Sequence, residues 1–212
     1  SVIATIIGGL LGMFIYEYKR LAVPVMVVVN FLYTIPSISM LGLLLYVSGV
    51  GNTTAIIALV IYALLPMVRN TFTGLNQIDR AMCEAGIALG LTRIQRLWNI
   101  EIPLAMPTIM AGIRTMLVMT IALTGIASFI GAGGLGVAIY RGITTNQSAL
   151  TIAGSLLIAL LAITVDALFS LGERVTRISP HMKRYTIIFV SIMTIIAMGI
   201  GGWAMYCRHV KT

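Results

Sequence analysis

Charged side chains are scarce in this chain: they make up 9% of its 212 residues, whereas an ordinary soluble domain is about a quarter charged. Histidine and cysteine are rarer still, with two of each and no Cys-x-x-Cys pair. A large soluble core is therefore excluded, and so is a metal centre built on closely spaced His and Cys ligands. The sequence also lacks a Walker-type glycine loop with a lysine and a nucleophile–base pair, so we expect no catalytic residue.

The sequence is rich in hydrophobic residues, which are arranged in long runs. Hydrophobic residues make up 59% of the chain, and the mean hydropathy is +1.03. Several apolar runs approach the roughly 20 residues that a membrane helix needs, and the period-2 alternation of a membrane β-strand is missing. We therefore predict an all-α polytopic membrane protein. The apolar runs are 2–16, 21–50, 53–68, 104–130, 149–171 and 185–206.

The first two apolar runs depart from a simple membrane helix. At about 1.5 Å per residue, the run 2–16 is roughly 22 Å long, which is short of the ~30 Å hydrocarbon core. In the second run Pro36 removes one backbone hydrogen bond, which predicts a kink that a membrane helix tolerates. This kink is either a packing feature or a hinge that lines a translocation path.

Basic residues are distributed unevenly between the connectors. If the apolar runs cross the membrane alternately, ten of the fourteen lysines and arginines fall on one side. By the positive-inside rule this side is cytoplasmic, which places residues 79–103 in the cytoplasm and the carboxyl end outside. Cys83 and Cys207 then lie on opposite sides, so we expect no disulfide between them. The formal net charge of +8 follows from this topology, and we expect no nucleic-acid partner.

The stretch 81–107 is the longest one between apolar runs that cannot itself span a bilayer. Apolar residues recur in it at helical spacing, and Gly90 is a suitable end for a first helix. We predict two short helices that meet near Gly90 and lie beside the membrane. Such an elbow presents a compact, partly charged surface to a soluble partner.

The motif in this stretch is Glu84-Ala85-Gly86, then Gly90 after three residues, then Ile100-Glu101-Ile102-Pro103 after nine more. It resembles the EAA loop of ABC importer permeases, whose pattern is Glu-Ala-Ala, three residues, Gly, nine residues and Ile-x-Leu-Pro. Gly86 and Ile102 are conservative departures from that pattern. In the family this loop docks into a groove of the ATPase subunit. Its small residues suit a close approach, and its first glutamate suits pairing with a basic residue of the groove.

The resemblance implies a type I ABC importer permease fold in a bacterial cytoplasmic membrane, with about five core transmembrane helices and a sixth at the carboxyl end. It implies a permease domain over 1–178, with the coupling loop at about 79–103, and an extra helix in 179–212. It also implies a homodimer with a second permease copy, two ABC ATPase subunits that bind ATP and Mg, an extracytoplasmic substrate-binding protein, and no cofactor in this chain. The coupling residues implied are Glu84, Ala85, Gly86, Gly90, Arg93, Ile100, Ile102 and Pro103.

Further motifs resemble the permeases for osmoprotectants, the quaternary amines glycine betaine, carnitine and choline. Permeases for methionine and other substrates share the glycine run, so methionine, another amino acid and ergothioneine stay open as cargo. Tyr33 and Tyr62 are suited to contact a quaternary ammonium by cation–π attraction, or else pack as ordinary core. The motifs are Thr34-Ile35-Pro36-Ser37, Tyr62-Ala63-Leu64-Leu65-Pro66, Arg69-Asn70-Thr71, Ile130–Gly136 and Arg141-Gly142.

The glycine run also matches a dinucleotide-binding fingerprint literally, as Gly131-x-Gly133-x-x-Gly136. That interpretation fails because the run follows a membrane span rather than a β-strand, and no acidic residue lies about 20 positions on. We expect a tight external turn between closely approaching helices. The alternative is a direct transport role for Gly131, Gly133 and Gly134.

Two charged residues lie within apolar runs. Arg114 and Asp166 each need a partner, because a charged side chain at a helix centre costs roughly 2.5–3.5 kcal/mol on insertion scales. Three interpretations are open: an ion pair in the cytoplasmic half, separate extension of the two side chains to the interface, or carriage of a proton or ion by Asp166.

The sixth apolar run is more than a minimal permease of this type needs. Some relatives fuse the binding protein at this point, including transporters for ergothioneine, so we expect a receptor domain after residue 212 and further residues before Ser1. Other transport classes predict different features. A secondary transporter would show inverted repeats, which the sequence does not reveal, and a channel would work without nucleotide.

Overall fold

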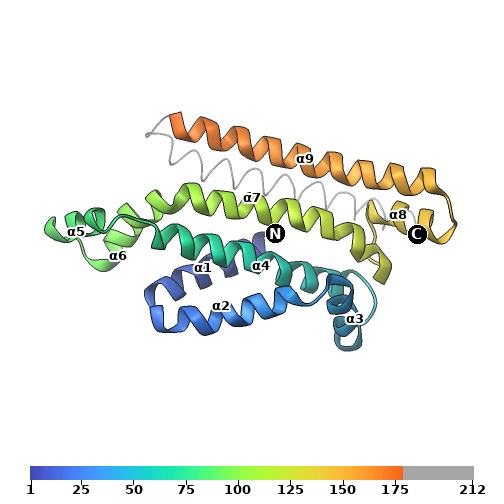
Figure 1. The fold of residues 1–212 in the computed structure, drawn as a ribbon, viewed down its shortest axis with the longest axis horizontal. Coiled ribbons are helices and arrows are strands. Elements are labelled where there is room, and N and C mark those ends of the chain that lie inside the picture. Colours follow the sequence, from blue (N-terminus) through green and yellow to red (C-terminus); the bar gives the residue numbers. More distant parts are fainter. Residues whose placement is uncertain (179–212) are drawn as a thin grey trace, which may run out of the picture. The chain divides into compact units, whose positions relative to one another are not determined.

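The computed structural model describes residues 1–178, and every regular element in that part of the chain is a helix. The predicted sixth run, 185–206, and the extra segment 179–212 lie outside the described residues. Residues 1 and 3–167 form one compact unit, and the other described residues, Val2 and 168–178, lie outside it. The elements (Figure 1) are α1 (Val2–Glu17), α2 (Lys19–Thr34), α3 (Ser37–Ser48), α4 (Asn52–Asn76), α5 (Arg80–Ala88), α6 (Arg93–Arg96), the π-helix η1 (Leu97–Glu101), α7 (Ile102–Ala127), the 3₁₀ turn η2 (Ser128–Ile130), α8 (Gly136–Thr144) and α9 (Ser148–Ile178).

Three helical segments of the described chain are long and apolar enough to cross a membrane: 52–76, 93–130 and 148–171. α2 and α3 pass the same test together, but they are bent by 96° at the break between them, so they form a broken span or a re-entrant loop. α1 is apolar but shorter. The apolar runs predicted before residue 178 therefore all form helices. The first run forms α1, which is shorter than a membrane span, as its length in the sequence predicts.

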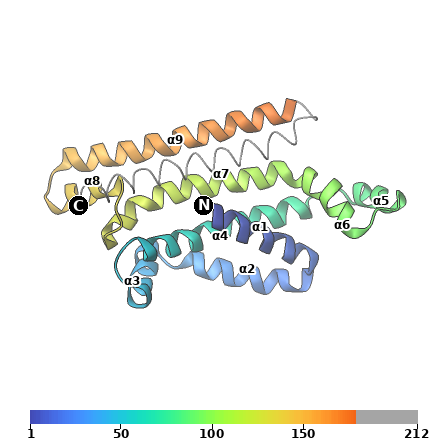
Figure 2. The same ribbon diagram turned by 180° about the vertical axis from the view of Figure 1, so that it is seen from behind.

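The helices α4 and α7 form the centre of the first unit, where they lie side by side (Figures 1 and 2). Small residues make their close approach possible. A Cβ atom on Gly74 would lie 3.0 Å from the Cβ of Thr108, and one on Gly112 would overlap the side chain of Asn70. Glycine is required at these contacts because any larger side chain would separate the two backbones.

The helix α4 is longer than the sequence predicts. The predicted apolar run ends at residue 68, whereas the helix continues through a polar stretch to Asn76. Thr71 and Leu75 are almost fully buried, with 1% and 0% of their surface exposed. Residues that suggest a connector therefore continue the packed face of the helix, because neighbouring helices cover them.

The helix α1 packs on α4 through two glycines one turn apart. A Cβ on Gly8 would lie 2.8 Å from the Cβ of Met67, and one on Gly12 would lie 2.5 Å from the Cβ of Thr71. Ile15 continues this face and packs with Val68 in a buried cluster. The carboxyl end of α1 is thereby fixed against α4, directly before the turn into α2.

At Pro36 the chain breaks rather than kinks, which corrects the expectation of one bent helix. α2 ends at Thr34, Ile35 has extended backbone angles, and Pro36 precedes the first turn of α3. The buried Tyr62 side chain of α4 donates its hydroxyl hydrogen bond to the carbonyl of Ile35. This bond satisfies a backbone group that the break leaves without a helical partner.

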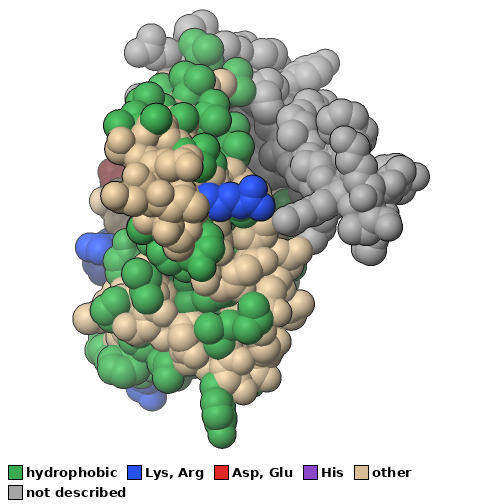
Figure 3. Space-filling model, turned by 90° about the vertical axis from the view of Figure 1, so that its right-hand side faces the viewer, with side chains coloured by type: hydrophobic (Ala, Val, Ile, Leu, Met, Phe, Trp, Pro, Cys, Tyr) green, Lys and Arg blue, Asp and Glu red, His purple; other side chains and the backbone are tan. Residues whose placement is uncertain are grey.

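At the opposite end of α7 from α5 and α6, the glycine run forms the turn that the sequence predicts (Figures 1 and 2). Gly131 and Gly134 have φ angles of 78° and 103°, which disfavour other residues. Ser128 holds the turn by donating to the carbonyl of Gly136 over 2.9 Å. Seen from this end, the described surface is mostly hydrophobic or neutral, with few charged side chains (Figure 3).

Candidate coupling site

The coupling loop (residues 79–103) begins with α5, whose two ends are both fixed by local hydrogen bonds. The Asp79 side chain accepts from the backbone N–H of Ala81 at 3.0 Å and caps the first turn. At the other end the N–H of Leu91 bonds to the carbonyl of Gly86 at 3.1 Å, and the N–H of Gly90 bonds to that of Ile87 at 2.9 Å. This is a Schellman cap: α5 ends at Ala88, and Gly90 is the residue that terminates it, as the sequence predicts.

Gly90 supplies the left-handed residue that this cap needs, with φ of 73°. Two residues later α6 begins with a capping box. The Thr92 hydroxyl accepts from the backbone N–H of Gln95 at 3.4 Å, and the Gln95 side chain accepts from the backbone N–H of Thr92 at 2.9 Å. The predicted pair of short helices meeting near Gly90 is therefore confirmed. Gly90 terminates α5, and the Thr92–Gln95 capping box starts α6.

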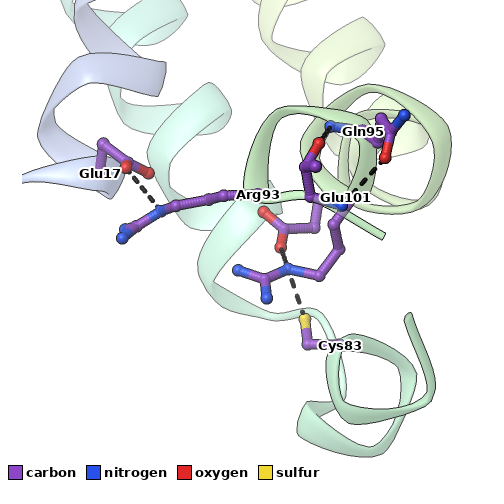
Figure 4. A network of polar contacts seen from close by, with 7 residues as sticks. Glu17, Cys83, Arg93, Gln95 and Glu101 are labelled. Atoms are coloured by element: carbon purple, nitrogen blue, oxygen red, sulfur yellow. Dashed lines mark hydrogen bonds and ion pairs between the residues drawn. The ribbon is translucent and has the colours of Figure 1, made fainter. Parts of the chain in front are cut away.

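Inside the loop, a buried carboxylate holds the second half of the motif (Figure 4). Glu101 has 3% of its side chain exposed and accepts from Nε of Arg96 at 2.6 Å. The thiol of Cys83, on α5, donates to the same carboxylate at 3.8 Å. A single carboxylate thus connects α5, α6 and the start of α7.

The protonation of this cluster follows from its contacts. An arginine side chain stays cationic in proteins, so Arg96 compensates the charge of the buried Glu101 carboxylate that it binds. Burial raises the pKa of the Cys83 thiol, and the charge of Glu101 adds to the effect. The thiol is therefore a neutral hydrogen-bond donor at physiological pH rather than a reactive thiolate.

The residue pair Arg96 and Glu101 is separated by five positions, and it meets because the intervening segment Leu97–Glu101 is a π-helix. An α-helix brings residues three and four apart onto one face, so sequence spacing does not predict this pair. A second pair, Glu17 with Arg93 at 2.6 Å, joins the end of α1 to α6 (Figure 4). The sequence carries no signal for this contact, since the two residues lie far apart along the chain.

The two halves of the motif touch at Gly86. This glycine is buried, and a Cβ atom on it would lie 2.8 Å from Cδ1 of Ile100. Pro103 and Ile102 lie half-buried at the start of α7. The motif residues of the second half therefore serve the internal packing of the loop.

The motif residues of the first half are mostly exposed. Glu84, Ala85, Gly90 and Arg93 all lie on the surface of the elbow. Large apolar side chains lie exposed beside them: Ile87 (57%), Leu89 (78%), Ile94 (71%) and Trp98 (60%). Exposed apolar side chains grouped in this way are typical of a binding face.

The remaining predicted residues lie in other places. Tyr33 and Tyr62 form an edge-to-face pair with ring centroids 6.0 Å apart, next to the break at Pro36. Gly131, Gly133 and Gly134 lie in the turn after α7, so the structure does not bring them to the coupling loop. On α7 and α9, Arg114 and Asp166 form an ion pair in which the guanidinium donates to both carboxylate oxygens.

Comparison with known proteins agrees with this architecture. The chain is 44% identical to the glycine betaine/carnitine/choline transport system permease protein OpuCD of Bacillus subtilis (strain 168) over 182 residues, which are 85% of this chain and 79% of that protein. It is 43% identical to the choline transport system permease protein OpuBD of the same strain over 184 residues, 86% of this chain and 80% of that one. It is also 40% identical over 168 residues to the ergothioneine transport permease/ergothioneine binding protein EgtU of Helicobacter pylori (strain G27), covering 79% of this chain but 30% of that protein.

Solved structures share the fold at lower identity. The methionine ABC transporter MetNI in an inward-facing conformation has a TM-score of 0.66 at 21% identity, over 82% of this chain and 91% of that one. An amino acid ABC transporter structure has a TM-score of 0.65 at 24% identity, over 82% and 87% of the two chains. The chain therefore has the fold of a type I ABC importer permease.

A family model described as "binding-protein-dependent transport system inner membrane component" matches residues 4–178. This match includes the capped elbow, the buried Glu101 cluster and the apolar helices on either side. Proteins of this family are permeases that work with ATPase subunits and a substrate-binding protein, and are not enzymes themselves. With the relatives and the shared fold, the match shows that the chain belongs to the family of inner membrane components of binding-protein-dependent transport systems.

Proposed function

We propose that this chain is the permease subunit of an ATP-driven importer for quaternary-amine osmoprotectants such as glycine betaine, carnitine and choline. The observation that carries the proposal is the 43–44% identity, over more than four fifths of this chain, to permeases named for these cargoes. Ergothioneine is the second candidate, because the relative named for ergothioneine transport is 40% identical. A methionine or other amino-acid cargo has weaker support, since the transporters of that kind resemble this chain at 21–24% identity.

In the proposed assembly, two copies of the permease form one pathway, and two ATPase subunits bind the coupling loops from the cytoplasm. ATP and Mg bind those subunits, and no cofactor binds this chain. The exposed apolar residues Leu89 and Ile94 supply contact area on the elbow. Glu84 is exposed beside them and supplies a carboxylate for a basic residue of the ATPase. Movement of the ATPases would then reach α7 through the Arg96–Glu101 pair.

The proposed orientation puts the coupling loop in the cytoplasm and the carboxyl end outside. The cytoplasmic placement is supported by the basic residues near the elbow, among them Lys19, Arg20, Arg80 and Arg93. A binding protein delivers cargo at the external side, either as a separate chain or as a domain fused after residue 212. The name of the Helicobacter pylori relative includes both a permease and a binding protein, which is the reason to test for a fusion.

We place the pathway near the break at Pro36 and the pair Tyr33 and Tyr62. An aromatic ring attracts a quaternary ammonium through its face, and a transient contact of this kind suits a cargo that must leave again. The α2–α3 bend of 96° provides the hinge in this proposal. The glycine turn at Gly131, Gly133 and Gly134 is the external counterpart, where the binding protein would dock.

The decisive experiment reconstitutes the full chain with its ATPase and binding protein in liposomes. ATP hydrolysis and uptake are measured with glycine betaine, choline, carnitine, ergothioneine and methionine. We expect uptake that requires ATP, and stimulation by the quaternary amines. Stimulation by methionine alone would overturn the cargo proposal, and uptake without nucleotide would overturn the importer mechanism in favour of a channel or a secondary transporter.

A further inference from the structure

A cavity of about 780 Å³ lies between the α1–α2 corner (residues 17–21) and the coupling loop. Most of its wall comes from residues outside the Glu-Ala-Gly motif. The Glu17–Arg93 ion pair joins its two sides. The lining residues are Tyr16, Glu17, Tyr18, Lys19, Arg20, Leu21, Arg80, Cys83, Glu84, Ile87, Arg93, Arg96, Leu97 and Glu101.

The wall of the cavity carries an excess of positive charge. In the wall, Glu17 forms an ion pair with Arg93, and Glu101 forms an ion pair with Arg96. Within the part of the chain that the structure describes, Lys19, Arg20 and Arg80 have no carboxylate partner, and Glu84 is the one acidic residue of the wall without an ion pair. Three cations and one carboxylate are therefore available to a ligand, which favours an anion.

The position of the cavity points to a lipid rather than to a soluble anion. It lies where the apolar helix α1 ends and the apolar helix α2 begins, which in the proposed orientation is the level of the cytoplasmic membrane surface. Phe14 and Tyr18 are exposed there with ring centroids 4.9 Å apart, as aromatic residues are at membrane interfaces. Leu21 is 42% exposed and lines the cavity, so the wall also has an apolar edge for the start of an acyl chain.

We propose that this cavity binds the phosphate headgroup of an anionic phospholipid such as phosphatidylglycerol. Lys19 and Arg20 hold the phosphate from the corner, and Arg80 holds it from the start of α5. The bound headgroup then bridges the corner to the coupling loop, as the Glu17–Arg93 pair does with protein atoms alone. This inference goes beyond the proposed function and depends neither on the cargo nor on ATP hydrolysis.

The test measures binding of phosphatidylglycerol to the purified full chain in detergent, by native mass spectrometry and by titration with a fluorescent phosphatidylglycerol. The variant K19Q/R20Q removes two cations of the wall. The matched control R69Q/R141Q removes two exposed cations that do not line the cavity. We expect affinity to fall roughly tenfold to thirtyfold in K19Q/R20Q, as expected for two surface cations. It should stay within about twofold in the control and in the charge-retaining K19R/R20K.

Several results would overturn the proposal. These are unchanged phosphatidylglycerol binding in K19Q/R20Q, an equal loss in R69Q/R141Q, or equally tight binding of phosphatidylcholine. Displacement of the lipid by millimolar glycerol phosphate would show a site for a soluble anion instead. Should K19Q/R20Q fail to fold, a photoreactive phosphatidylglycerol on the wild-type chain decides the matter: crosslinks at 16–21 and 80–87 support the site, and their absence there rejects it.

Discussion

Gly90 determines the geometry of the coupling loop at the residue scale, because its φ angle of 73° lies in the left-handed region. A Cβ atom added at this position would meet no other atom within 4 Å, so the cost of a side chain comes from the backbone alone. We expect Gly90→Ala to cost about 1–2 kcal/mol locally and to reduce cargo-stimulated ATP hydrolysis. Gly90→Asn should be milder, since asparagine tolerates this conformation.

The control for this change is Gly42→Ala, at a helical glycine of α3 that has equally open surroundings and no positive φ. It should leave the ATPase rate unchanged. Equal losses in Gly90→Ala and Gly42→Ala would show that the left-handed turn is unimportant for coupling.

Cys83 offers a pH-dependent readout of the buried cluster. Burial and the Glu101 carboxylate raise the pKa of its thiol, so at pH 8 a smaller fraction is thiolate than in an exposed cysteine. In a Cys207→Ser background, iodoacetamide should label Cys83 more slowly than a cysteine placed at the exposed Gln77. The labelling rate of Cys83 should also continue to increase up to a higher pH than the rate of the exposed cysteine. Glu101→Gln lowers the pKa and should accelerate labelling at pH 8. Slower labelling in that variant would contradict the cluster.

At the element scale, the Arg114–Asp166 pair joins α7 to α9. Each single neutralisation, Arg114→Gln or Asp166→Asn, breaks the ion pair and keeps one of its two charges, whereas the double variant removes both charges. We expect the double variant to be far milder than either single one in thermal melting of the purified chain. Additive losses would show that the two residues contribute independently.

The α1–α4 contact depends on glycine at close range. Gly12→Ala places a Cβ atom 2.5 Å from the Cβ of Thr71, which cannot move without the backbone. We expect a loss on the order of 1–3 kcal/mol from overpacking, measured by denaturation. Gly9→Ala is the matched control on the same helix, because its nearest contact is the flexible Cε of Met67 at 3.5 Å. Similar stability of the two variants would mean that the helices separate freely.

At the scale of the whole molecule, the charge distribution predicts the orientation in the membrane. In a chain with both native cysteines replaced by serine, a cysteine at Gln77 should react with a membrane-impermeant maleimide only in inverted vesicles. A cysteine at Val50, which is exposed directly before the opposite end of α4, should react only in intact cells. Reaction of both residues from the same side would contradict the positive-inside assignment.

Much of the molecule is determined by its sequence alone. Apolar runs of sufficient length must form helices in a bilayer, because no water is present there to satisfy the backbone. The elbow is equally local: Asp79, Gly90 and Thr92 each fix a helix end through hydrogen bonds within a few residues. Hence the coupling loop, its boundaries and its exposed motif face follow from short-range chemistry.

The tertiary structure decided what depends on contacts between distant segments. α4 extends to Asn76 because other helices bury Thr71 and Leu75, and the chain breaks at Pro36 where Tyr62 is available to bond Ile35. The Glu17–Arg93 pair depends on the corner between α1 and α2, and the Arg96–Glu101 pair depends on the π-helix η1. Residue spacing in the sequence specifies neither feature. Helix formation is a local free-energy balance, whereas the partner of a charge is set by which backbones can approach one another.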